Sequence, residues 1–77
     1  MSDKVLTELA DKLAADTLRA MDDLGDERLF EEIAAVLGAS SQSAEEAFLT
    51  SIRIRLAERR ARKVLEARIA AAATPSE

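Results

Sequence analysis

The stretch that decides the fold runs from Phe30 to Arg60 and reads FEEIAAVLGASSQSAEEAFLTSIRIRLAERR. Apolar residues at three-four spacing, typical of a helix, lead into a short polar turn and then into a second helical pattern. Ser43 is followed three residues later by Glu46, which is typical of a capping box: each side chain satisfies a free backbone N–H at the helix start. We therefore expect one helix to end at Gly38 and the next to begin at Ala44.

The helix that begins at Ala44 is predicted to be long. No glycine or proline interrupts the chain after it until Pro75, and alanine, leucine, glutamate and arginine, all good helix formers, dominate the stretch. A helix over residues 44–72 rises about 43 Å at 1.5 Å per residue. The last four residues, 74–77, are expected to form a disordered tail.

Two shorter helices are predicted upstream. The first covers residues 3–24, with leucines and alanines along one face, and Gly25 suits a left-handed stop at its end. The second covers residues 27–37, because acidic side chains such as Glu27 favour a helix N-terminus. Strand-forming residues occur singly, never in alternating runs. The chain is therefore predicted to be all-α: a small three-helix domain over residues 1–73 with a long C-terminal helix.

The apolar face of the long helix changes direction along its length. At about 100° per residue, Phe48, Ile52 and Leu56 lie near Leu49 and would pack in a bundle. A second apolar set lies almost opposite: Ala57, Ala61, Val64, Leu65 and Ile69. One bundle does not cover both sets, so we expect the second set to contact another copy of the chain, in a homodimer, or another protein. The alternative is that the two alanines are simply exposed and that the first helix covers the other three residues.

Charge is unevenly distributed along the chain, whose net charge is −4. The first 47 residues carry 12 acidic and 4 basic side chains, whereas residues 48–77 carry 3 and 7. The basic residues form a predicted stripe on the long helix: Arg55, Arg59, Arg60, Arg62 and Lys63. An acidic protein surface or another copy of the chain is the preferred partner, ahead of nucleic acid and then of a membrane. Alternatively, the stripe is a solvated face that pairs with the acidic half of its own chain.

Residues 31–40, EEIAAVLGAS, resemble the DNA-binding helix-turn-helix of sigma-factor C-terminal domains and response regulators. The family has an apolar helix with a small residue at the Ala34 position and then Leu-Gly-apolar-Ser, and the arginines between Arg53 and Arg60 lie where it has a basic tail. The resemblance implies a regulator that binds nucleic acid. The sequence departs from the family at Glu45 and Glu46, whose carboxylates would face negative phosphates in the major groove.

Enzymatic chemistry has few side chains to use, because the chain contains no His, Cys or Tyr. We expect no catalytic residue, no metal site, no cofactor and no disulfide. No apolar run approaches the length of a membrane span, so a soluble cytoplasmic protein is expected. The predicted function is a small, non-enzymatic protein–protein interaction module, such as a regulator, adaptor or accessory subunit, that uses the long helix. The alternative is a helix-turn-helix regulator that binds nucleic acid.

Overall fold

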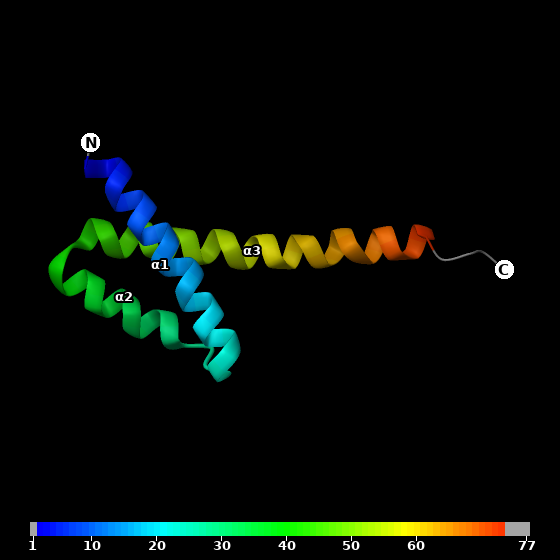
Figure 1. The fold of residues 1–77 in the computed structure, drawn as a ribbon, viewed down its shortest axis with the longest axis horizontal. Coiled ribbons are helices and arrows are strands. Elements are labelled where there is room, and N and C mark those ends of the chain that lie inside the picture. The colour runs from blue at the N-terminus through cyan, green and yellow to red at the C-terminus, as the bar shows by residue number, and fades with distance from the viewer. Residues whose placement is uncertain (1, 74–77) are drawn as a thin grey trace.

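The computed structural model describes residues 2–73 and consists of three helices (Figure 1). Helix α1 spans Ser2–Leu24, α2 spans Leu29–Ser40 and α3 spans Gln42–Ala73. No strand occurs among the described residues. The predicted all-α class with a long C-terminal helix is therefore confirmed. The predicted disordered tail, 74–77, lies outside the described residues.

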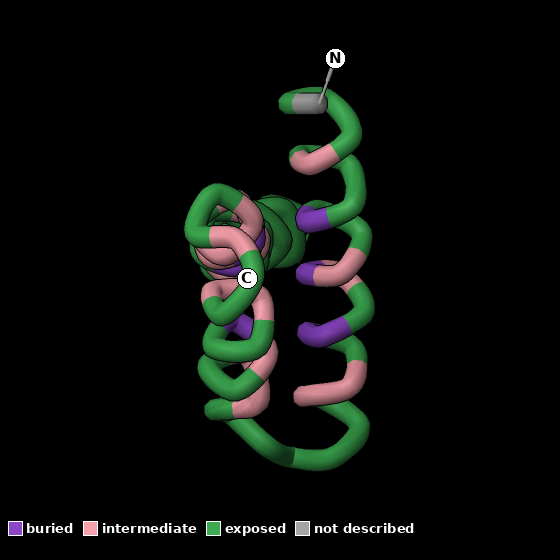
Figure 2. The backbone as a smooth tube through the Cα atoms, turned by 90° about the vertical axis from the view of Figure 1, so that its left-hand side faces the viewer, coloured by how far each residue is buried: buried purple, intermediate pink, exposed green. Residues whose placement is uncertain are grey.

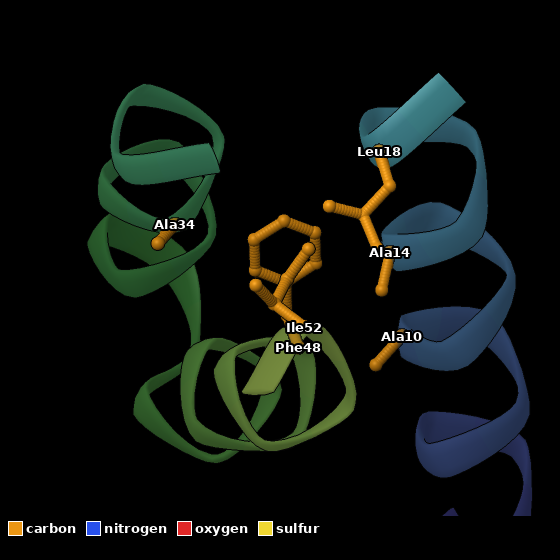
Figure 3. Close-up of a cluster of buried hydrophobic side chains, with 6 residues drawn as sticks. All are labelled: Ala10, Ala14, Leu18, Ala34, Phe48 and Ile52. Carbon is orange, nitrogen blue, oxygen red and sulfur yellow. The ribbon is translucent and has the colours of Figure 1, made fainter. Parts of the chain in front are cut away.

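Helices α1 and α2 pack on the first half of α3, and α1 crosses it at a steep angle (Figure 1). The buried positions of α1 lie on the side that faces the other two helices (Figure 2). Phe48 and Ile52 of α3 are the largest fully buried side chains, and the Phe48 ring points between α1 and α2 (Figure 3). Small or apolar side chains surround them, namely Ala10, Ala14, Leu18 and Ala34. The three alanines allow the helix backbones to approach closely around the two large residues.

Helix α1 ends as the sequence predicts. Gly25 has a φ of +67°, and it is the only residue with positive φ among the described residues. The backbone N–H of Asp26 donates to the carbonyl of Met21 at 3.1 Å, which is the long hydrogen bond of a Schellman motif. The Asp26 carboxylate then accepts a hydrogen bond from the backbone N–H of Arg28 at 3.0 Å. This arrangement reverses the chain into α2.

Helix α2 begins two residues later and ends three residues later than the predicted span of about 27–37. The helix begins at Leu29, and the Asp26 carboxylate accepts from the backbone N–H of Arg28, which lies in the turn before the helix. It also continues through Gly38 to Ser40, so Gly38 does not end it. A glycine ends a helix by adopting positive φ, and Gly38 does not do so.

The predicted capping box of Ser43 and Glu46 is also wrong. Because α2 extends to Ser40 and α3 begins at Gln42, Ser41 is the single residue between them, and it has extended backbone angles. Its hydroxyl oxygen accepts a hydrogen bond from the backbone N–H of Ala44 at 3.1 Å. Ser41 is therefore the residue that caps α3. Ser43 lies inside the first turn of the helix.

Helix α3 runs well past the bundle. Every residue from Ala57 to Ala73 is exposed, and Figure 1 shows this half of α3 extending away from α1 and α2. The projection gives the molecule its elongated dimensions of 60 × 31 × 13 Å. We call residues 57–73 the projecting half of α3.

Candidate partner-binding face on the long helix

The five residues of the predicted partner face all lie on the projecting half of α3 and are exposed. The three large ones are more than half exposed: Val64 at 65%, Leu65 at 53% and Ile69 at 59%. Helix α1 does not cover them, so the alternative in which the first helix wraps around to this face is excluded. The structure therefore leaves an apolar helix face in contact with solvent.

Ile54 extends this face toward the bundle and was missed in the sequence. Its side chain is 63% exposed, although the neighbouring Ile52 is buried. At about 100° per residue, Ile54 points in a direction between those of Ala61 and Leu65. The same periodicity would have found it, but Ile54 stands in the half of the helix that was assigned to the core. We call Ile54 and the five predicted residues together the apolar face.

Two open hollows flank Ile54 along the junction of α1 and α3. One, of about 290 Å³, lies toward the start of α3 and is lined by Thr7, Asp11, Ala47, Thr50, Ser51, Ile54 and Arg55. The other, of about 480 Å³, lies toward the projecting half and includes Ala15, Arg19 and Glu58. The apolar face is thus bordered, beside α1, by hollows with both apolar and charged lining residues.

The basic stripe divides into paired and unpaired side chains. Arg55 donates to the Asp11 carboxylate at 2.8 Å, and Arg59 donates to both carboxylate oxygens of Asp22 at 3.0 and 3.2 Å. The alternative of pairing with the acidic half of the same chain is therefore confirmed for these two arginines. Arg62 pairs within its own helix with Glu58 at 2.6 Å.

Four other cations of α3 have no ion pair within residues 2–73, and they are Arg53, Arg60, Lys63 and Arg68. Three of them lie on the projecting half. The positive charge that is free to meet a partner is thus concentrated where the helix leaves the bundle.

Asp11 is the acidic group most affected by its surroundings. A hydrogen bond from the Ser51 hydroxyl, at 2.7 Å, and the bond from Arg55 hold the pKa of its carboxyl below the usual 3.8. Both donors come from α3, so this carboxylate joins α1 to α3. The negative charge of Asp11 is therefore already paired within the molecule.

A smaller apolar hollow lies at the other end of the bundle. It measures about 170 Å³ and is lined by Leu6, Leu9, Ala10, Leu13, Leu37 and Ala44. Small-molecule sites usually measure about 300–1,000 Å³ and include a few polar groups. This hollow is smaller and almost wholly apolar, so it does not have the character of such a site.

Within residues 2–73 no group of three or more acidic, His or Cys side chains is placed to hold a metal ion. None of the helices described has the length and apolar character needed to cross a membrane. No protein-family model, curated protein or solved structure matches the chain. The resemblance to a helix-turn-helix therefore stays a prediction, and function has to be argued from the apolar face and its charges.

Proposed function

We propose that this chain is a small, non-enzymatic protein–protein interaction module that binds its partner through the apolar face of α3. The exposure of Val64, Leu65 and Ile69 carries the proposal. Burying such a side chain is worth roughly 1.5–3 kcal/mol, so a partner that covers all three gains a substantial binding energy. A regulator, an adaptor or an accessory subunit in the cytoplasm is the role we propose for such a module.

The helical state of the projecting half supports the same proposal. Most helical stability in proteins comes from packing of an amphipathic face rather than from helix propensity. No residue of the projecting half is buried, and Arg59, at its start, is the residue that reaches α1 through its ion pair with Asp22. A partner on its apolar face would supply that packing and hold the helix in register.

The unpaired cations indicate the chemistry of the partner surface. Arg60, Lys63 and Arg68 lie on the projecting half with no ion pair among the described residues. Complementary charges around an apolar contact raise the association rate and suppress wrong partners. We expect the partner surface to carry acidic groups around an apolar centre.

Nucleic-acid binding through a helix-turn-helix is the second proposal, and the unpaired Arg53 and Arg60 favour it. Two features of the α2–α3 corner weigh against it. The motif joins its helices by a turn of about three or four residues, whereas Ser41 alone separates α2 from α3. The carboxylate of Glu45 lies against Gly38, and Glu46 is exposed near the start of α3, where its negative charge would repel phosphates. We expect the purified protein to show no specific binding to duplex DNA at physiological salt.

A photo-crosslinking phenylalanine analogue tests the proposal in cells of the native host. We would place it at Leu65, on the apolar face, and as a matched control at Ala67, which points about 160° away. Both residues are exposed, so neither change disturbs the bundle. Crosslinks to protein from position 65 and not from position 67 are expected. Equal crosslinking from both positions, or none from either, would show that the apolar face binds no protein.

A further inference from the structure

One edge of the apolar face carries four charged residues of alternating sign. Arg55, Glu58, Arg62 and Glu66 are spaced by three or four residues, so they follow one another along the same side of α3. At about 100° per residue they fall within roughly 80° of each other, directly beside Ile54, Leu65 and Ile69. Glu58, Arg62 and Glu66 are exposed and Arg55 is partly exposed.

This order of charges is complementary to itself only when it is reversed. In an antiparallel pair of helices, Arg55, which also pairs with Asp11 of its own chain, comes near Glu66 of the second copy. Glu58, which pairs with Arg62 of its own helix, also comes near Arg62 of the second copy, and the same two contacts recur on the other side of the axis. In a parallel pair, this edge of one helix lies on the opposite side of the interface from the same edge of the second copy, so the four charges do not meet one another. Flanking charges of this kind set partner choice and orientation in paired helices.

The apolar residues fit the same register. With Arg55 opposite Glu66, Ile54 fits between Leu65 and Ile69 of the second copy, and Ala57 lies opposite Val64. Ala61 then lies close to the two-fold axis, where a small side chain lets the two helices approach closely. The charge pairs and the apolar contacts depend on different residues and agree on the position of the axis.

We propose that the partner of the apolar face is a second copy of this chain, bound antiparallel along α3 with the two-fold axis near Ala61. This inference rests on the proposed function and names the partner. Each projecting half would run over the other molecule's Ile54 and onto the hollow lined by Ala47 and Thr50. The eight exposed large apolar side chains of the pair would then be covered together.

The charges of the two molecules favour this antiparallel arrangement. The projecting half carries the unpaired Lys63 and Arg68, whereas the bundle that it would approach belongs to the acidic part of the chain. One like pair, Arg53 with Arg68 of the second copy, falls on the far edge of the interface. Both of these side chains are exposed and extend into water, where repulsion is screened.

Single cysteines test the geometry, because the chain has no cysteine of its own. In the proposed pair the two copies of residue 61 lie beside the axis, within the 4.4–6.8 Å between Cα atoms that a disulfide allows. The two copies of residue 57 are displaced by about 10 Å along the helices. Mild oxidation should therefore link Ala61→Cys into a covalent dimer and leave Ala57→Cys unlinked. Mixing Ala57→Cys with Val64→Cys should restore the link.

Equal linking of Ala57→Cys and Ala61→Cys would indicate a parallel pair and overturn the proposal. A wild-type protein that sediments as a monomer at every concentration, with no link at either position, would also overturn it. In that second case, crosslinking in cells from position 65 to a different protein would leave the proposed function intact. If that crosslink is missing as well, both proposals fail.

Discussion

The guanidinium of Arg59 donates hydrogen bonds to both carboxylate oxygens of Asp22 and joins α3 to the end of α1. No residue of α3 beyond this pair is buried, as far as the description extends at Ala73. The pair therefore marks the point where α3 leaves the bundle. It also shows how the acidic and basic parts of the chain partly neutralise each other within one molecule.

This ion pair is expected to contribute little to stability. Both side chains are about half exposed, and surface pairs of this kind are worth about 0–1 kcal/mol. Arg59→Gln should therefore lower the free energy of unfolding by less than about 1 kcal/mol. Phe48→Ala removes a fully buried ring and should cost about 3–5 kcal/mol, a large part of the stability of a domain this small. Urea denaturation of both variants measures the difference, and a larger loss for Arg59→Gln would contradict the assignment of the core.

The cap of α3 gives a second prediction. Ser41→Ala removes the acceptor for the backbone N–H of Ala44 and should destabilise the protein by about 1 kcal/mol. Ser43→Ala is the matched control, because Ser43 is exposed within the first turn and should tolerate alanine. The urea midpoints of the two variants decide between them. A shift for Ser43→Ala alone would restore the capping box that the sequence suggested.

The two glycines should respond in opposite ways to alanine. Gly25 has a φ of +67°, where a side chain costs about 1–2 kcal/mol, so Gly25→Ala should destabilise. Gly38 lies within α2, where alanine is favoured by up to about 1 kcal/mol. A Cβ at Gly38 would lie 2.6 Å from Oε1 of Glu45, at the flexible end of that side chain, which can rotate away. Thermal unfolding should therefore show no loss for Gly38→Ala; a loss as large as that of Gly25→Ala would refute this account.

The carboxyl of Asp11 predicts a pH dependence. Its pKa is lowered by the hydrogen bonds from Ser51 and Arg55, so the folded state binds this proton less readily than the unfolded state does. The resulting stability is present above the usual pKa of 3.8 and is lost as the pH falls through the lower folded value. Arg55→Gln should raise the pKa of Asp11, whereas Arg53→Gln, at an unpaired arginine, should leave it unchanged. Carboxyl NMR titration measures both, and equal effects would rule out the direct pairing.

Local patterns predicted the parts of the fold that local physics controls. The three-four spacing of leucines and alanines gave the number of helices, and the glycine after Leu24 gave the end of α1. The change in direction of the apolar face after Leu56 indicated that α3 would extend beyond its bundle. Each of these depends on residues close together in the sequence.

The remaining features depend on contacts between helices. Gly38 remains helical, so α2 reaches Ser40, and the cap moves to Ser41 although the sequence rule favoured Ser43. The pairing of individual arginines depends on how α1 crosses α3, because that crossing brings Asp11 to Arg55. Ile54 was missed because it stands in the half of α3 assigned to the core, although it points about 160° away from the buried Ile52.

Analytical ultracentrifugation over a concentration series tests most directly whether the apolar face of α3 is a binding surface. The wild-type protein should shift from monomer toward dimer as its concentration rises. Leu65→Glu should remain a monomer with unchanged stability, because Leu65 contacts nothing in the bundle, and Ala67→Glu on the opposite side should behave as the wild type. A wild-type monomer at every concentration, together with no face-specific crosslink from position 65 in cells, would contradict the account.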